Sequence, residues 1–287
     1  MTTDEDLVAA PPHEEDRDVT TLASPPPSAI LLSIAYDGRR FAGFARQPAQ
    51  RTIAGELLGA VQAIDPTVRE VRGVSRTDAG VHARDQRVAF DPKVRIPPRG
   101  WALGLARHLP EDIAIRRAAL VPPGFVPRFT SVKKRYRYRV AFDLLRDPFL
   151  EGRAWRIPER LDDAMIARLR EEAAPLLGTH DFAAFRSSAD DRENTVRTLF
   201  VVEPERDPAD PCGLWITVEG TAFMHNMVRI LVGTLIDVAR GRKPPGAAAR
   251  ALASRDRRDA GITAPPDGLV LDRVWLENEG AEAWPDV

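Results

Sequence analysis

The sequence predicts an α+β fold made of two halves that share one mostly antiparallel sheet. Two observations predict it. Apolar residues with strand-like alternation and apolar residues with helical spacing follow one another in the order β-α-β-β-α-β. The same order then repeats, with the break near residue 128. This is the order of the split βαβ, or ferredoxin-like, unit. Two such units paired edge to edge would carry their helices on one side of the sheet and leave a central cleft.

The first half is expected at residues 29 to 128. A strand at 30 to 36 ends in the turn signal Tyr36-Asp37-Gly38. A helix at 52 to 64 follows, because apolar residues recur there at helical spacing and Thr52 can act as its N-cap. The remaining elements follow in order: a strand at 68 to 75, a strand through Phe90, a short helix near 99 to 108 and a strand at 113 to 120.

The second half is expected at residues 129 to 287. It opens with a strand at 135 to 142 in which tyrosines alternate with arginines, so Tyr136 and Tyr138 share one face of the strand. That face is either a core face or a surface that stacks on bases. The later elements are a helix at 162 to 177, strands at 198 to 203 and 214 to 219, a strong helix at 223 to 239, a short helix at 246 to 254 and a last strand at 269 to 276.

Residues 1 to 28 differ in composition from the rest of the chain. They hold seven acidic residues, one basic residue and several prolines with little periodicity, which predicts a disordered acidic tail. The whole chain carries a net charge of −1. Without the tail, 40 basic and 35 acidic residues remain, which is a net charge of +5. A mildly basic body of this kind is compatible with RNA binding but does not require it.

The composition also limits the class of protein. The single cysteine, Cys212, excludes a disulfide framework and a cysteine-based zinc site within one chain. A metal site of Asp78, His82 and Asp85 is rejected, because that spacing needs a helix and the expected strands oppose one. No apolar run approaches membrane-spanning length, and the N-terminus lacks a signal-peptide pattern. We therefore expect a cytoplasmic protein without a membrane segment.

The stretch of greatest chemical interest runs from Ser75 to Ala83, between two expected strands. Gly80 allows the chain to turn there, so Asp78 is expected on a loop at the rim of the sheet, with Arg76 two residues away. Asp78 is either a turn residue that bonds its own backbone or a catalytic carboxylate.

The strong helix of the second half carries a cation within an apolar run. Arg229 is either solvent-facing or directed at a buried carboxylate, which it would hold in the ionised state. His225 and Asn226 precede it and are candidates for RNA contacts or helix caps.

These residues resemble one known family. The run Arg76-Thr77-Asp78-Ala79-Gly80-Val81-His82-Ala83 is similar to the signature of the tRNA pseudouridine synthase A family. The similarity spans roughly Ile30 to Leu276. Further matching motifs are Tyr36-Asp37-Gly38 with Phe41, Gly43 and Gln47-Pro48, then Lys134-Arg135-Tyr136-Arg137-Tyr138, Gly178-Thr179-His180-Asp181-Phe182 with Phe185, Asn226-Met227-Val228-Arg229 through Leu235, and Gly268-Leu269. The chain departs from the family pattern at Ser75, Phe44 and Ala106, where Gly, Trp and Asn are usual.

The resemblance implies an isomerase that acts on uridines in the anticodon arm of tRNA (tRNA positions 38 to 40). Such an enzyme breaks the N1–C1′ bond, turns the uracil and rejoins it through C5. By resemblance, Asp78 is the essential carboxylate, which reacts with either the base or the sugar, and Arg229 is its partner. Tyr136 would stack on the target uracil, and Arg76 would fill the space that the extruded base leaves. Further residues expected to contact RNA are Arg46, Gln47, His82, Arg128, Arg135 and Asn226.

The resemblance also implies that the central cleft binds RNA and that no metal or organic cofactor is needed. It further implies a homodimer in which one tRNA touches both subunits. Two alternatives stay open: a pseudouridine synthase that acts on a different uridine or a different RNA, and a non-catalytic tRNA-binding protein of the same fold. The bare pattern also allows a small-molecule enzyme of ferredoxin-like fold, which would lack affinity for RNA.

Overall fold

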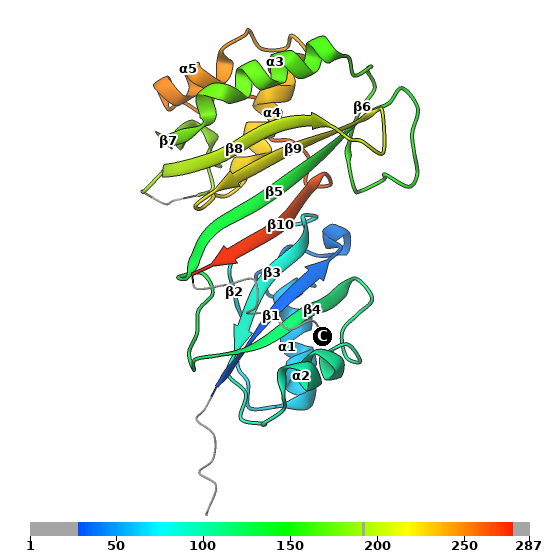
Figure 1. Ribbon diagram of the computed structural model, residues 1–287, viewed down its shortest axis with the longest axis vertical. Coiled ribbons are helices and arrows are strands. Elements are labelled where there is room, and N and C mark those ends of the chain that lie inside the picture. Colours follow the sequence, from blue (N-terminus) through cyan, green and yellow to red (C-terminus); the bar gives the residue numbers. More distant parts are fainter. Residues whose placement is uncertain (1–27, 191–192, 278–287) are drawn as a thin grey trace, which may run out of the picture.

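The computed structural model describes residues 28–190 and 193–277 (Figure 1). The acidic tail predicted at residues 1 to 28 therefore lies outside the described residues, apart from Ser28. The first half contains the strands β1 (Ala29–Tyr36), β2 (Arg72–Gly73), β3 (His82–Phe90) and β4 (Ile113–Val121) and the helices α1 (Ile53–Ile64) and α2 (Pro98–Leu105). A short 3₁₀ helix, Gly38–Arg40, follows β1.

The second half contains more elements than the sequence predicted. Its strands are β5 (Ser131–Phe142), β6 (Trp155–Ile157), β7 (Gly178–Asp181), β8 (Val196–Arg206), β9 (Gly213–Gly220) and β10 (Leu269–Leu276). Its helices are α3 (Asp163–Ala173), α4 (Met227–Ala239) and α5 (Ala247–Ser254), with 3₁₀ turns at Ala174–Leu176 and Ala183–Phe185. The short strands β6 and β7 were not predicted, since three or four residues leave little periodic signal.

Within the described residues, one sheet runs in the order β4-β1-β3-β10-β5-β9-β8-β7, with β2 beside β3 and β6 beside β5. The first half thus has the order β4-β1-β3-β2, and the second half has the order β10-β5-β9-β8. Both are the strand order of a ferredoxin-like unit, which confirms the predicted fold class. The two units meet where β10 pairs parallel with β3, whereas most other pairs are antiparallel. In Figure 1, β10 (red) lies between β3 and β5.

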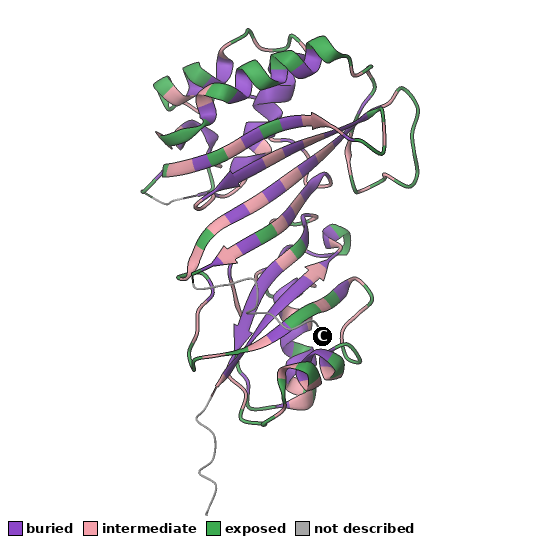
Figure 2. Cartoon of the chain, in the orientation of Figure 1, coloured by how far each residue is buried: buried purple, intermediate pink, exposed green. Residues whose placement is uncertain are grey.

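The helices of both halves cover the same face of this sheet. On β5, Tyr136 and Tyr138 are buried, while the alternating arginines are only half-buried on the other face. A cavity beside Tyr136 is lined by Ala54 of α1 and by Met227 of α4, so helices from both halves lie on the tyrosine side. Figure 2 shows that burial is nearly continuous along β1 and β3 in the first half.

Several predicted boundaries were wrong, each for a local reason. The strand expected at 68 to 75 is only β2, because residues 68 to 70 would face the chain beyond the end of β3 at Phe90. After Gly73 the chain leaves the sheet before it reaches the start of β3, where β10 pairs with His82 and Ala83. Helix α4 begins at Met227 rather than at 223, because Asn226 adopts a left-handed conformation with φ of 60°. Helix α3 ends at Ala173, before the turn that contains Pro175.

Candidate active site

Alternate residues of the loop between β2 and β3 are tied into the protein interior. Gln86, which is fully buried on β3, donates from Nε2 to the Ser75 carbonyl at 2.7 Å and accepts from the Ser75 N–H at 3.3 Å. The hydroxyls of Thr77 and Tyr36 are hydrogen-bonded at 2.7 Å. With Ser75 and Thr77 held in this way, the intervening Arg76 and the following Asp78 line a cavity.

Two glycines allow this loop to take its path. Gly43 has a φ of +106°, and a Cβ there would lie 2.8 Å from the Thr77 carbonyl oxygen. The Phe44 N–H donates to that same carbonyl at 3.0 Å, so the opening motif packs directly on the loop. Gly80 has a φ of +79°, in a turn closed by a hydrogen bond from the Val81 N–H to the Asp78 carbonyl at 3.2 Å. The turn that Gly80 predicted is therefore confirmed.

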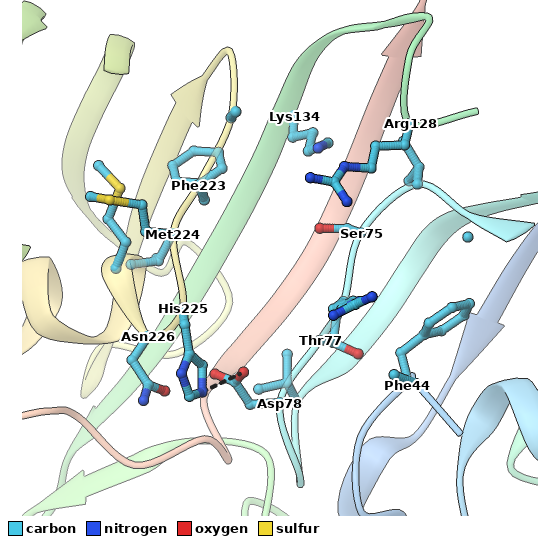
Figure 3. Close-up of a pocket in the computed structure, with 18 of the residues that line it drawn as sticks. Phe44, Ser75, Thr77, Asp78, Arg128, Lys134, Phe223, Met224, His225 and Asn226 are labelled. Carbon is cyan, nitrogen blue, oxygen red and sulfur yellow. Dashed lines mark ion pairs between the residues drawn. The ribbon is translucent and has the colours of Figure 1, made fainter. Parts of the chain in front are cut away.

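The cavity lies between the two halves and has a volume of about 910 Å³. Its walls come from the Asp78 loop, from strand β5 and from the segment that precedes α4 (Figure 3). The lining includes Phe44, Arg46, Ser75, Arg76, Thr77, Asp78, Arg128, Lys134, Tyr136, Arg197, Phe223, His225 and Asn226.

Two side chains from the second half face the two oxygens of the Asp78 carboxylate. His225 Nε2 lies 3.4 Å from Oδ1, as Figure 3 shows. Arg229, which does not line the cavity, places Nη1 3.5 Å from Oδ2. Arg229 is fixed by hydrogen bonds from Nε to the Ala264 carbonyl at 2.7 Å and from Nη1 to Asn226 Oδ1 at 2.6 Å. The Asp78 side chain is 23 % exposed. Of the two possibilities for Arg229, the structure shows the one in which it reaches a carboxylate.

Tyr136 forms part of the cavity wall and is held at two points. Its hydroxyl is hydrogen-bonded to Ser75 Oγ at 2.9 Å, and its ring meets the edge of Phe223 at 5.0 Å between centroids. Burial raises the pKa of Tyr136 to about 12, the Ser75 hydrogen bond opposes that rise, and the negative charge of Asp78 adds to it. The hydroxyl is therefore neutral throughout the physiological pH range.

Three arginines of the cavity are exposed and available for a ligand. Arg46, Arg76 and Arg128 line the cavity and make no hydrogen bond or ion pair with other residues in the part of the chain that the structure describes. Lys134 lies beside Arg128 in Figure 3 and is nearly buried. Free guanidinium groups at the mouth of a cavity are suited to bind phosphates.

Three residues predicted to contact RNA do not line this cavity. Gln47 Nε2 donates to the Ala42 carbonyl at 2.8 Å. The buried His82 accepts from the Gly38 N–H at 3.2 Å and contacts the Gly152 carbonyl at 3.0 Å. Arg135 lies on the opposite face of β5, where it pairs with Glu219 and lies over Trp275.

Sequence reasoning did not assign a role in the site to Lys134, Phe223 or Gln86. Lys134 could have been found, because it lies two residues before Tyr136 on a strand and must share its face. Gln86 and Phe223 have no such signal, since each acts through a contact with a distant segment.

The structure gives no support to a metal site or a membrane segment. Among residues 28–190 and 193–277, no three His, Cys, Asp or Glu side chains are grouped so that they could hold a metal ion. Asp85 does not converge with Asp78, since it accepts from the Ser33 hydroxyl and pairs with Arg87. No helix in the same residues has the length and apolar character needed to cross a bilayer.

Comparisons with known proteins agree with this geometry. Residues 173–275 match the family model described as tRNA pseudouridine synthase. Over 251 residues the chain is 39 % identical to the tRNA pseudouridine synthase A of Citrifermentans bemidjiense, which covers 87 % of this chain and 98 % of that protein. It is 38 % identical to the protein of the same name from Bacillus subtilis, with 87 % and 99 % covered. The protein of that name from Myxococcus xanthus is 39 % identical, with 87 % and 92 % covered. With this identity over nearly the whole length of its relatives, the chain belongs to the tRNA pseudouridine synthase A family and is an isomerase.

Proposed function

We propose that this enzyme converts uridine to pseudouridine in the anticodon arm of tRNA, at tRNA positions 38 to 40, with Asp78 as the reacting carboxylate. One observation carries the proposal: Asp78 lies inside the cavity between the halves, where Arg229 and His225 face its two oxygens. The signature around Asp78 is the part of the sequence that most resembles the family, which supports the same assignment.

The reaction moves a glycosidic bond within one nucleotide. The N1–C1′ bond breaks, the uracil turns and a C5–C1′ bond forms. C5 then loses its proton and N1 gains one, so no oxidant or second substrate is consumed. A carboxylate must be ionised to take part as a nucleophile or as a base. Arg229 supplies the opposite charge, with Nη1 3.5 Å from Oδ2 of Asp78.

We assign the target uracil to the part of the cavity beside Tyr136. Removing a base from its helix costs a few kcal/mol, and stacking on an aromatic ring returns roughly 1–3 kcal/mol. The Tyr136 ring is fixed by Ser75 and Phe223, so little rotamer entropy is lost when a base stacks on it. Arg76 is exposed at the same cavity, which suits it to occupy the space that the base leaves in the RNA.

We further propose that Arg46, Arg128 and Asn226 contact the RNA around the target nucleotide, since all three line the cavity. The resemblance supports a homodimer in which one tRNA touches both subunits. From the composition we also propose a cytoplasmic enzyme. For the homodimer, the test is sedimentation of the protein with and without tRNA. A single monomeric species in both samples contradicts it.

The decisive experiment maps pseudouridine in tRNA incubated with and without the enzyme. We expect new pseudouridine at positions 38 to 40 and at no other uridine. Conversion elsewhere in tRNA, or only in another RNA, would instead identify a pseudouridine synthase that acts on a different uridine or a different RNA. Tight tRNA binding without any conversion would favour a binding protein, and absence of RNA affinity would favour a small-molecule enzyme.

The role of Asp78 has its own test. Asp78→Asn should abolish conversion while tRNA binding persists, because the amide keeps the shape of the side chain but loses its charge. Tritium release from tRNA that carries 5-tritiated uridine measures the turnover, and filter binding measures the affinity. Turnover within tenfold of the wild type contradicts the assignment.

A further inference from the structure

His225 is placed to act on the same carboxylate as Arg229. Its Nε2 atom lies 3.4 Å from Oδ1 of Asp78 (Figure 3), whereas Arg229 faces Oδ2. The two partners therefore meet different oxygens of one carboxylate. Neither the sequence pattern nor the family signature assigns this contact, because His225 lies outside the motif that begins at Asn226.

The main chain at His225 is anchored on both sides. Its N–H donates to Oδ2 of Asp190, a buried carboxylate, at 2.8 Å. Its carbonyl accepts from the Ser187 N–H at 3.2 Å. These bonds fix the position of Cα, so the ring reaches Asp78 from a rigid base. The side chain is 40 % exposed and lines the cavity.

Arg229 alone does not determine the orientation of the Asp78 carboxylate. Its Nε and Nη1 atoms already donate to the Ala264 carbonyl and to Asn226, and its contact with Asp78 runs from Nη1 to Oδ2 at 3.5 Å. A carboxylate held at one oxygen can still rotate about the bond to its Cβ. A second donor at the other oxygen removes that freedom. A reacting group needs such fixed geometry, because small displacements at the reacting atoms lower the rate strongly.

We propose that His225 is a positioning residue for pseudouridine formation, donating from Nε2 to Oδ1 of Asp78 so that the carboxylate faces the target nucleotide in one orientation. This inference rests on the proposed role of Asp78 as the reacting group. The present distance is longer than a hydrogen bond. Catalytic contacts of this kind commonly shorten when the substrate is bound. The neutral ring with a proton on Nε2 and the imidazolium both donate there.

The test compares two replacements of similar size. His225→Gln keeps an N–H donor at the end of the side chain, and His225→Leu removes it. Single-turnover rates are measured with enzyme in excess over a tRNA that the wild-type enzyme is seen to modify, and tRNA affinity and melting temperature are measured for each protein. His108→Leu is the matched control, because His108 is exposed and does not line this cavity.

We expect His225→Leu to lower the single-turnover rate roughly 10- to 100-fold, the range expected for one lost hydrogen bond to a charged group. We expect its tRNA affinity to stay within about threefold of the wild type. His225→Gln should recover most of the rate, and His108→Leu should keep it.

Three results would overturn the inference. The first is a His225→Leu rate within threefold of the wild type. The second is a loss confined to affinity, which makes His225 an RNA contact. The third is an equal loss of rate and melting temperature in both His225 variants, which makes it a structural residue. If the proposed uridine positions are wrong, the pseudouridine map made with the wild-type enzyme will show it. The single-turnover rates of the variants relative to the wild type would be unchanged.

Discussion

At the residue scale, the site places one carboxylate between two partners from the other half of the molecule. Asp78 comes from a loop of the first half, Arg229 comes from the first turn of α4 in the second half, and His225 comes from the segment that precedes α4. Because the partners belong to different halves, the reactive geometry exists only when the halves are correctly joined. Catalysis and the integrity of the interface between the halves are therefore coupled.

Removing Arg229 should impair both activity and stability. Arg229→Ala leaves Asp78 without its cation and leaves the Ala264 carbonyl without its donor. Deleting one partner of a buried pair costs about 3–5 kcal/mol. Since the side chains of Arg229 and Asp78 are 16 % and 23 % exposed, we expect Arg229→Ala to lower the free energy of unfolding by about 2–3 kcal/mol. Arg229→Lys should recover only part of the activity, because an ammonium cannot make the same set of directed hydrogen bonds.

Thermal unfolding and tritium release from labelled tRNA measure the two effects of Arg229→Ala. Asp78→Ala serves as the comparison, because it removes the carboxylate and should cost less stability than the loss of its partner. Unchanged melting together with normal turnover in Arg229→Ala contradicts the proposed pairing.

Tyr136 should contribute through its ring more than through its hydroxyl. Tyr136→Phe keeps the aromatic face and the contact with Phe223 but loses the bond to Ser75, so activity should fall by less than tenfold. Tyr136→Leu removes the stacking surface, which is worth roughly 1–3 kcal/mol, so its activity should fall further than that of Tyr136→Phe. Single-turnover rates of the two variants test this, and an equal loss would instead point to the hydroxyl.

The raised pKa of Tyr136 gives a second check on the same residue. The folded pKa of about 12 lies above the ordinary value of 10.0. The neutral phenol is therefore favoured by folding, and this contribution to stability is present below pH 10 and lost as the pH rises towards 12. Burial raises the pKa of all three tyrosines, so absorbance at the phenolate wavelength should change little near pH 10, and Tyr136→Phe should lose one of the groups that titrate at higher pH.

At the element scale, buried polar side chains accept hydrogen bonds from backbone N–H groups that have no partner within a helix or strand, and so connect neighbouring segments. Asp65 is the clearest case. It follows the last residue of α1, is 1 % exposed, and accepts hydrogen bonds from the backbone N–H groups of Thr67, Lys93 and Val94. One carboxylate thus ties the end of α1 to the segment that leads into α2.

Asp65 should make stability depend on pH in the acid range. Burial alone would raise the pKa of Asp65, but the hydrogen bonds from Thr67, Val94 and Lys93 outweigh it and lower the pKa to about 2. Because the pKa is depressed, the contribution of Asp65 to the free energy of unfolding is complete above the ordinary value of 3.8 and is lost as the pH falls towards 2. A shift of this size corresponds to about 2–3 kcal/mol.

Asp65→Asn should therefore lower the free energy of unfolding by about 2 kcal/mol at pH 7. The further fall in that free energy between pH 4 and 2 should be smaller than in the wild type. Urea unfolding of both proteins across this pH range gives the comparison. Asp163→Ala is the matched control, because that carboxylate is 96 % exposed and should change stability by less than about 0.5 kcal/mol. Parallel pH curves for Asp65→Asn and the wild type would show that Asp65 does not carry this effect.

At the scale of the whole molecule, the two halves share a sheet through a very short strand contact. Strands β3 and β10 pair over only two residues on each strand. Beyond that pair, side chains replace the missing backbone bonds. Asp85 Oδ2 accepts from the Val274 N–H at 3.0 Å, and the buried Arg87 donates to the Val274 carbonyl at 3.3 Å. Asp85 and Arg87 also form an ion pair at 2.8 Å.

Breaking this junction should separate the behaviour of the two halves. Asp85→Ala removes the ion pair with the buried Arg87 and the acceptor of the Val274 N–H, and should cost about 3–5 kcal/mol. Because Asp78 and Arg229 belong to different halves, turnover should fall as well, although Asp85 is not in the cavity. Calorimetry is expected to show a lower melting temperature or two transitions, and a single transition at the wild-type temperature contradicts this role.

The sequence by itself determined the order of the main elements, the ferredoxin-like character of both halves, and some of the residues that meet at the site. Thr52 as the N-cap of α1 and Gly80 as the turn residue were correct, because capping and left-handed turns depend on nearby residues. Asp78, Arg76, Tyr136 and Arg229 do share one site, as the family motifs implied.

Only the tertiary structure decided the features that depend on a distant partner. The loop that follows β2 depends on the pairing of β3 with β10, and the left-handed turn before α4 brings Asn226 into a hydrogen bond with Arg229. His82 and Arg135 face away from the cavity, and Gln86 and His225 act within or beside it, through contacts across many residues of sequence. Local periodicity records which face of an element is buried. It carries no information on which segment will cover that face. At this site the covering segment decides whether an arginine or a histidine stays at the surface or becomes a partner of the reactive carboxylate.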